Sequence, residues 1–449
     1  MLDELLYGYD FEAHYPLHMP GHKRRGGGVH TYDITEIPGF DDLHQPTGPI
    51  AELMAGYAAL YGAAYTGLSV NGSTAGVLAA LFAAKQHGAD VLIGRQCHRS
   101  VYDATAIHDL RPRFFYPKTD PISGIVTGYD YEALADVLHR HPEIGSMVFT
   151  SPTYEGVCVD IVRLREIADE TDTLLIVDEA HGAHRIFRTG GTALAQGAHI
   201  VIQSLHKTLP ALTATAVVHV HADTPQATAA ALRTGMRMFQ TSSPSYILLS
   251  SIARCLRYLK TEGAAADRAH RATLSVLRER FRGLKHIRLF ETADYDDYKL
   301  VFVTNGTNGT GPELYERLYE AGFTLEMAAD TYVIAMTSAA DRQACLYAFA
   351  DCVTAVDASM TAAPLRQLPH QAIQIMTPEI APSIAVHASQ TTVDIADATG
   401  RIAAAPVYLY PPGVPIVSYG ERYTPAVTAC LTAYDSLGLL STRCVQVLK

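Results

Sequence analysis

The chain has 449 residues, of which 48% are hydrophobic and 18% are charged, and its formal net charge is −11. This length predicts a folded protein with a large core and one or two smaller units. Lys and Arg cluster only in short groups, so we expect no nucleic-acid-binding surface. The longest apolar stretches, such as residues 74–84, are too short to cross a membrane.

Two further features suggest the compartment. Residues 1–16 are acidic and lack the basic region and the apolar core of a signal peptide, so we expect a cytoplasmic protein. The cysteines number seven, and no two have CxxC spacing. We expect reduced thiols, mostly in the core, and neither disulfides nor a zinc site.

Residues 1–50 are rich in Gly, Pro, His and Asp and predict an extended arm. From residue 51, apolar runs alternate with amphipathic helices, which indicates an α/β fold with a mostly parallel sheet and helices on both faces. Helices are predicted at 51–62, 70–88, 100–110, 131–142 and 162–171, and strands at 89–95, 111–117, 145–152, 173–181, 198–207 and 214–222.

The pattern changes after two long helices predicted at 243–263 and 267–284. The next strands (286–291, 298–304, 331–337) and helices (312–322, 342–356) indicate a smaller α+β unit. The predicted organisation is an N-terminal arm (1–50), a large α/β domain (51–264), a small α+β domain (265–357) and a C-terminal domain (358–449).

Four polar clusters stand at predicted strand ends, at residues 71–76, 150–156, 178–184 and 204–207. Ligands of open α/β sheets bind beyond the carboxyl ends of the strands, so we expect the clusters to converge. In the first cluster, the hydroxyls of Ser73 and Thr74, the N–H groups of the following helix and its dipole could hold a phosphate. An ordinary helix N-cap has the same pattern, so this cluster alone leaves both interpretations open.

Asp178 ends a strongly hydrophobic strand, LLIVD. A carboxylate there is partly desolvated and needs a cation or hydrogen bonds. It could hold a pyridinium nitrogen protonated, bind a metal together with His181 and His184, or belong to an ordinary turn. Asp178 by itself does not decide among these three interpretations.

Lys207, in QSLHKT, favours the first interpretation. A desolvated lysine can act as a Schiff-base amine, whereas a metal site gains nothing from a neighbouring ammonium. An aldehyde cofactor with a phosphate and a ring nitrogen needs a phosphate cradle, an acid and a lysine, which Ser73 and Thr74, Asp178 and Lys207 supply. Pyridoxal phosphate is such a cofactor. The alternative is a surface lysine whose stem lies along apolar groups.

Eight motifs, taken together and in order, resemble the ornithine/lysine/arginine decarboxylase family in its short bacterial form. The resemblance runs from about residue 5 to the C-terminus and is weak over residues 265–365. The motifs are HMPGHK (18–23), VNGSTAG (70–76), CHRS (97–100), PTYEG (152–156), DEAHGAH (178–184), QSLHKTLPALT (203–213), TSSPSY (241–246) and YPPGVP (410–415).

The resemblance implies a fold-type-I pyridoxal-phosphate enzyme whose large domain, 51–264, binds the cofactor. It assigns the Schiff-base amine to Lys207 and the partner of the pyridine nitrogen to Asp178. His98 would lie over the ring, and His181 would lie near its phenolic oxygen. No metal is expected.

The resemblance also implies how the phosphate is held. Ser73, Thr74, Ser204 and His206 would bind it, and Ser242 of TSSPSY would reach it from a second subunit. The protein is therefore expected to be a homodimer or a higher even homo-oligomer.

The implied reaction is decarboxylation of a basic amino acid in polyamine metabolism, with arginine favoured, agmatine as its product, and lysine or ornithine next. Two alternatives remain: another pyridoxal-phosphate reaction, such as transamination or aldol cleavage, and a non-enzymatic or metal-binding protein on the same fold. A substrate's distal cation needs an acidic partner. The candidates are Asp41, Asp42 and Glu421, which could equally be solvated surface carboxylates. The family keeps the arm at the active-site mouth, which makes His44 a further candidate.

Overall fold

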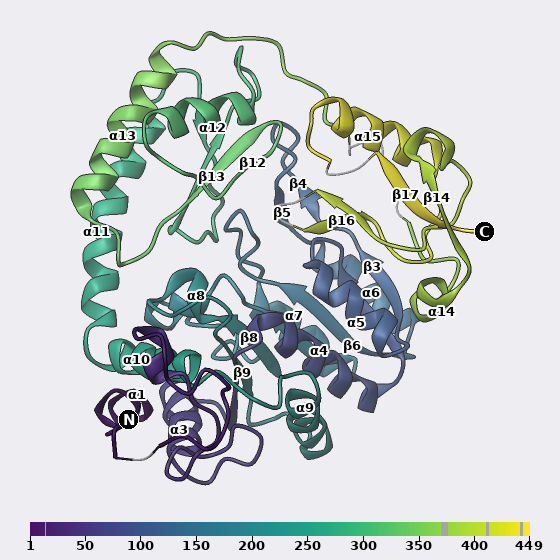
Figure 1. The fold of residues 1–449 in the computed structure, drawn as a ribbon. Coiled ribbons are helices and arrows are strands. Elements are labelled where there is room, and N and C mark those ends of the chain that lie inside the picture. The colour runs from purple at the N-terminus through teal and green to yellow at the C-terminus, as the bar shows by residue number, and fades with distance from the viewer. Residues whose placement is uncertain (14, 370–375, 410–412, 441–442) are drawn as a thin grey trace. The chain divides into compact units, whose positions relative to one another are not determined.

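The computed structural model describes residues 1–13, 15–369, 376–409, 413–440 and 443–449 (Figure 1). Residues 410–412 of the YPPGVP motif therefore lie outside the described residues. Contacts divide the chain into two compact units. Unit 1 comprises Met1–Gln86 and Leu175–Asp267, and unit 2 comprises His87–Leu174 and Arg268–Lys449.

The strands of unit 1 follow the order β1-β9-β8-β7. Strands β7 and β8 run parallel, and β9 is antiparallel to both of its neighbours. The elements are α1 (Leu2–Gly8), α2 (Val29–Tyr32), α3 (Pro49–Tyr61), β1 (Tyr65–Ser69), α4 (Gly72–Ala84), η1 (Lys85–His87), β7 (Leu174–Asp178), η2 (Ala183–Phe187), β8 (Ile200–Ser204), α8 (Leu205–Thr208), β9 (Ala216–Val220), α9 (Gln226–Met238) and α10 (Tyr246–Thr261).

Helix α4 packs closely on this sheet. Every residue of β8 and β9 is buried, as their continuous apolar runs predict. A Cβ at Gly76 of α4 would stand 2.7 Å from a methyl of Val218 and 3.0 Å from one of Ile202. On its other side, a Cβ at Gly235 of α9 would meet Ala79 at 2.9 Å. The two glycines thus allow α9, α4 and the strands to lie in close layers (Figure 1).

The predicted arm at residues 1–50 begins with a helix, α1, that the sequence analysis did not predict. Helix α1 buries Leu2 and Leu6, which are one helical turn apart, and it lies against α10. Arg257 of α10 pairs with Asp3 and Glu4 of α1. The overall Gly, Pro and His content of residues 1–50 hid this short amphipathic pattern. Strand β1 and helix α9 were also missed, since β1 is short and contains a glycine, and α9 has Thr234 and Gly235, which are poor helix formers, in its interior.

Unit 2 contains three parallel strands in the order β6-β2-β3. Their elements are β2 (Asp90–Gly94), α5 (Arg99–Ile107), β3 (Arg111–Phe115), β4 (Lys118–Thr119), β5 (Val126–Gly128), α6 (Tyr131–Arg140), β6 (Ile144–Thr150) and α7 (Ile161–Glu170). Because β6, β2 and β3 run parallel, as β7 and β8 do in unit 1, the predicted α/β fold with a mostly parallel sheet is confirmed.

The rest of unit 2 has two cores. An antiparallel sheet of order β10-β11-β13-β12 packs on helices through Phe281, Phe302 and Phe349, and a C-terminal core joins Val427, Leu431 and other apolar side chains. The elements are α11 (Gly263–Arg282), β10 (Arg288–Leu289), β11 (Lys299–Val303), α12 (Gly311–Glu320), β12 (Met327–Ala328), β13 (Tyr332–Met336), α13 (Gln343–Ala358), α14 (Pro382–His387), β14 (Gln390–Asp394), η4 (Ile395–Asp397), β15 (Val407–Leu409), β16 (Val414–Val417), α15 (Pro425–Ser436) and β17 (Cys444–Leu448).

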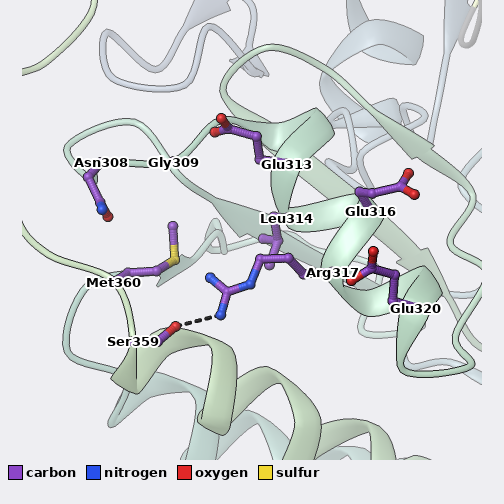
Figure 2. A pocket seen from close by; sticks show the side chains of 9 residues that line it. All are labelled: Asn308, Gly309, Glu313, Leu314, Glu316, Arg317, Glu320, Ser359 and Met360. Carbon is purple, nitrogen blue, oxygen red and sulfur yellow. Dashed lines mark hydrogen bonds between the residues drawn. The ribbon is translucent and has the colours of Figure 1, made fainter.

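A surface hollow of about 380 Å³ lies along α12, with Ser359 and Met360 on its other side (Figure 2). The guanidinium of Arg317 donates to the hydroxyl of Ser359, and Glu316 and Glu320 line the hollow near Arg317. None of the nine lining residues is a predicted site residue. The hollow is a feature of the small α+β part and not the predicted cofactor site.

Candidate active site

Lys207 was predicted at the end of a strand, but it lies in the short helix that follows the strand. Strand β8 ends at Ser204, and the one-turn helix α8 carries Lys207. The lysine is half-buried, and its Nζ is 3.1 Å from Nε2 of His181. The strand end therefore brings together two of the predicted catalytic residues, which are 26 positions apart in the chain.

Asp178 is the last residue of β7 and is 5% exposed. Its Oδ1 accepts the N–H of Ala180 at 3.1 Å. In the parallel pairing of β7 with β8, Asp178 stands opposite Ile202, two residues before Ser204. Both strands thus end at the same edge of the sheet. Asp178 and His181 lie at the end of β7, and Lys207 lies just after the end of β8. The part of the chain that the structure describes contains no group of three or more His, Cys, Asp or Glu that could hold a metal.

Two buried hydroxyls flank Lys207. Among the described residues, neither Oγ of Ser204 nor Oγ1 of Thr208 has a hydrogen-bond partner, although both side chains are almost fully buried. A buried polar group without a partner costs about 1–3 kcal/mol. Such hydroxyls are expected where a bound ligand supplies the missing acceptor. Thr208 was not predicted, but its place directly after the lysine in LHKT was a usable signal.

Helix α4 begins at Gly72, and its N-cap residue, Asn71, makes no side-chain capping bond. The side chains of Ser73 and Thr74 stand in the first turn and are partly or fully exposed. First-turn N–H groups without a side-chain cap are suited to an anion. The alternative interpretation of this cluster, an ordinary Ser or Thr N-cap, is wrong because the N-cap is Asn71.

Ala214 and Thr215 join the two predicted phosphate-binding segments. The carbonyl of Ala214 accepts the N–H of Gly72 at 2.7 Å. The carbonyl of Thr215 accepts the N–H of Leu205 at 3.1 Å and Nδ1–H of His206 at 3.0 Å. Ala214 has φ of +74°, a backbone conformation that costs an L-residue about 1–2 kcal/mol. This strained step holds the start of α4 beside α8.

The surroundings of His206 disfavour the charged form of its ring. Burial lowers the pKa of His206, and the charge of Lys207 lowers it further, against the raising effect of the hydrogen bond to Thr215. Since Nδ1 donates to Thr215, Nε2 is the atom left to face a ligand. A bound phosphate would favour protonation of that nitrogen.

His44 and Asp42 lie in a tightly bonded part of the arm. Nε2 of His44 donates to the carbonyl of Thr241 at 2.8 Å, and the N–H of Thr241 donates to Asn71 Oδ1 at 3.2 Å. His44 is thereby tied to the residue that precedes α4. Oδ1 of Asp42 accepts the N–H of His44 at 2.7 Å, and the contact of Asp42 with a substrate stays a prediction.

Asp41 holds the arm through backbone hydrogen bonds, and its contact with a substrate cation stays a prediction. Its carboxylate accepts the N–H groups of Thr47, Gly48 and Ile50, at 2.9, 2.8 and 3.0 Å. Burial acts to raise the pKa of Asp41, but the backbone donors bring it below its ordinary value. These bonds fix the arm to the start of α3.

The TSSPSY segment contacts the arm of its own chain. The hydroxyl of the buried Tyr246 donates to the carbonyl of Asp41 at 2.6 Å. Thr241, Ser242 and Ser243 are exposed. The prediction that Ser242 completes a neighbouring subunit's site stays a prediction.

His98 belongs to unit 2, where it is the N-cap of α5 and its Nδ1 accepts the N–H of Ser100 at 3.3 Å. Its predicted place over the cofactor ring stays a prediction. His184 is 1% exposed.

The structure contradicts the prediction that Glu421 reads the substrate's cation. Glu421 is 0% exposed, and its two oxygens accept hydrogen bonds from Arg95 at 2.8 and 2.9 Å. It also accepts the N–H of Ser418. A carboxylate that is inaccessible and already paired with a guanidinium cannot meet a substrate cation without breaking that pair. Its position in GERY gave no sign of this partner, 326 residues away.

A buried polar network lies beside the strand ends and was missed. Gln203 donates to Glu179 at 2.7 Å, and its Oε1 is 3.3 Å from Nε2 of His219, whose Nδ1 is 2.8 Å from the hydroxyl of Thr66. Tyr61 stacks on His219 at 4.4 Å. Glu179 follows Asp178, and Gln203 precedes Ser204. The network thus fixes the backbone at both strand ends.

We expect this network to weaken in acid. Burial lowers the pKa of His219 from 6.5 to about 3. Between these two pH values the unfolded chain is therefore protonated at His219 while the folded chain is not. Stability contributed by the neutral ring is full above pH ~6.5 and falls by about 1 kcal/mol per pH unit below it. His219→Gln should therefore reduce the loss of the free energy of unfolding between pH 7 and pH 5, measured in denaturant.

His221→Gln, two residues further along and partly exposed, is the matched control and should keep the loss seen in the parent. An identical pH dependence of the parent and His219→Gln would contradict the assignment of a neutral His219.

The chain matches two family models. Residues 8–306 match "Orn/Lys/Arg decarboxylase, major domain", and residues 359–437 match "Orn/Lys/Arg decarboxylase, C-terminal domain". The protein YaaO of Bacillus subtilis is 30% identical over 407 residues, which cover 88% of this chain and 83% of YaaO. An arginine decarboxylase of Halalkalibacterium halodurans is 28% identical over 456 residues, covering 94% of this chain and 90% of the relative.

Solved structures show the same fold. The constitutive lysine decarboxylase of E. coli has a TM-score of 0.80 at 17% identity, covering 100% of this chain and 81% of that one. Lysine decarboxylase A of Pseudomonas aeruginosa has a TM-score of 0.81 at 18% identity, covering 100% and 80%. A structure named SPT with PLP internal aldimine has a TM-score of 0.55 at 18% identity, covering 68% and 77%. The predicted fold type I is confirmed.

Among the described residues, no helix has the length and apolar character that a membrane crossing requires. The motifs, the two matched models and the similarity to YaaO agree with one another. The chain belongs to the Orn/Lys/Arg decarboxylase family.

Proposed function

We propose that the protein is a pyridoxal-phosphate-dependent arginine decarboxylase that produces agmatine, a polyamine precursor. The observation that carries the proposal is the edge of the sheet in unit 1. There, Lys207 lies 3.1 Å from His181, the buried Asp178 ends the neighbouring strand, and the buried hydroxyl of Ser204 has no hydrogen-bond partner among the described residues.

The residues present fit the cofactor. Ser204 Oγ is a buried hydroxyl without a partner among the described residues, and the first turn of α4 lacks a side-chain cap, so both suit a phosphate. The backbone of Ala214 and Thr215 ties these two segments together. Lys207 supplies an amine for an aldehyde, and Asp178 supplies a carboxylate for a ring nitrogen.

Pyridoxal phosphate, when bound, supplies an aldehyde for an amine and a ring that accepts the electrons left behind when CO2 departs. Asp178 would hold the ring nitrogen protonated, because a buried carboxylate is best stabilised by a cation. The amine of Lys207 would hold the cofactor through its aldehyde. Its Nζ would deliver the proton that takes the place of CO2 on the substrate's α-carbon.

His181 assists Lys207. A hydrogen bond of 3.1 Å joins Nε2 of His181 to Nζ of Lys207, so a proton can pass between them. Through this exchange His181 would resupply the proton that Lys207 delivers. The same bond limits the rotamers of Lys207.

Sequence coverage favours arginine as the substrate. Four relatives named arginine decarboxylase align with 90–94% of this chain, whereas two relatives named lysine decarboxylase align with 52–54%. The guanidinium of arginine is planar and is best bound by a bidentate partner, unlike the ammonium of lysine or ornithine, so a site can distinguish the two kinds of substrate.

We expect kcat/KM for arginine to exceed the values for lysine and ornithine by about tenfold or more. The measurement is CO2 release from each labelled substrate, with agmatine identified as the product. A higher kcat/KM for lysine or ornithine would show that this amino acid, and not arginine, is the preferred substrate. Release of no CO2 from any of the three, with transamination products instead, would overturn the decarboxylase proposal.

We also propose a homodimer with shared sites. Thr241, Ser242 and Ser243 are exposed in the single chain, as are Tyr15 and Leu17 of the arm. Co-expression of the inactive variants Lys207→Ala and Ser242→Asp should restore part of the activity, because some mixed dimers contain one intact site. No recovery, with an active monomer in sedimentation, would refute the sharing.

A further inference from the structure

Glu421 and Arg95 form a buried ion pair inside unit 2. Arg95 follows strand β2 and is 6% exposed, and Glu421 is 0% exposed. Besides the two bonds to Glu421, Arg95 donates to the carbonyl of Ile416 at 2.9 Å, and its guanidinium stands 4.5 Å from the ring centre of Phe114. The C-terminal segment is thereby bonded to the turn that leads into α5.

Two more contacts join the C-terminal segment to α5. The N–H of Arg99 donates to the carbonyl of Gly413 at 3.0 Å, and its guanidinium donates to the hydroxyl of Tyr408 at 2.7 Å. The hydroxyl of Tyr419 donates to Asp103 Oδ1 at 3.0 Å, one turn further along the helix. We call Tyr408, Gly413, Ile416, Tyr419 and Glu421 the C-terminal clamp.

His98 lies between the clamped residues. Arg95 is three residues before it, Arg99 is the next residue, and Asp103 is five residues after it. As the N-cap of α5, His98 accepts the N–H of Ser100 at Nδ1, which sets the direction of its ring and leaves the proton of the neutral imidazole on Nε2. The ring direction therefore depends on the first turn of α5, and the clamp fixes that turn.

We propose that the C-terminal clamp positions His98, with Arg95 and Glu421 as positioning residues that act through the start of α5. This inference rests on the proposed function and on the predicted place of His98 over the cofactor ring. It replaces the predicted substrate contact of Glu421 with a different role. A buried ion pair suits this role, because its bidentate geometry fixes one register of the two segments.

The test compares Glu421→Gln with Glu379→Gln. Glu379 pairs with Arg422 in the same C-terminal segment, but this ion pair is exposed. Hydrogen exchange of the cofactor-free protein is the first readout. Glu421→Gln should increase exchange in peptides covering residues 95–103 by about tenfold or more, while peptides of the C-terminal core at residues 425–436 keep the exchange of the parent. Glu379→Gln should change neither.

The loaded enzyme gives the second readout. Glu421→Gln should alter the circular dichroism of the bound cofactor and lower kcat about tenfold, while KM for arginine changes less than about twofold. Glu421→Asp, which keeps the charge, should restore part of both. Tyr419→Phe, which removes only the bond to Asp103, is the second variant if Glu421→Gln does not fold, and it should increase exchange at 95–103.

Three outcomes would overturn the clamp. Unchanged hydrogen exchange at residues 95–103 in Glu421→Gln would show that the clamp does not hold the start of α5. If Glu421→Gln does not fold, unchanged hydrogen exchange at residues 95–103 in Tyr419→Phe would show the same. A large rise in KM for arginine in Glu421→Gln, with unchanged circular dichroism of the bound cofactor, would indicate that Glu421 binds the substrate. Because the exchange experiment needs neither cofactor nor substrate, it stands even if the proposed function fails.

Discussion

Lys207→Ala should abolish turnover, with kcat falling by about 10⁴-fold or more, the range seen when a covalent catalytic group is removed. The loss follows from the geometry of α8, since no other amine is placed by this helix beside His181 and Ser204. The fold should survive, because Lys207 is half-buried and its stem carries little of the apolar core. The measurement combines CO2 release, circular dichroism of the backbone and the visible absorbance of bound cofactor.

Lys260→Ala is the control, since Lys260 is an exposed lysine at the end of α10. It should leave turnover and absorbance as in the parent. Retention of near-parental turnover in Lys207→Ala would refute the assignment of the site to this edge of the sheet.

Asp178→Asn should lower kcat by about 10²- to 10³-fold while changing stability little. The amide keeps an oxygen that can accept the N–H of Ala180, so the turn after β7 is preserved. It carries no negative charge, however, and cannot hold a ring nitrogen protonated. Steady-state kinetics and a denaturant titration of the same preparation separate the two effects.

Asp223→Asn removes an exposed carboxylate from the same unit and should leave kcat unchanged. An unchanged kcat in Asp178→Asn would remove the nitrogen-binding role from Asp178. A loss of stability in proportion to the loss of rate would make its role structural.

Local chemistry made part of the site predictable. Asp178 follows four apolar residues and Lys207 follows a buried strand, and parallel strands end at one edge of a sheet. Those facts are enough to bring Asp178, His181 and Lys207 together before any coordinates are known. The start of α4 was predictable for a similar reason, because small and hydroxyl residues precede an apolar run.

Other features depend on contacts between distant segments. The carbonyls of Ala214 and Thr215 join the start of α4 to α8, and backbone carbonyls leave no trace in a sequence. The pairing of Glu421 with Arg95 was equally hidden, so its carboxylate was assigned to a substrate. Helix α1 was missed because it is short, and its stability comes from packing on α10 more than from its own composition.

Lys207 is the residue that we propose binds pyridoxal phosphate. Reduction of the cofactor-loaded protein with borohydride makes the bond between lysine and cofactor permanent, and mass spectrometry of its peptides then locates the modified residue. We predict the pyridoxyl group on Lys207 and loss of the visible absorbance on reduction. A pyridoxyl group on another lysine, or a protein that takes up no cofactor, would contradict the account.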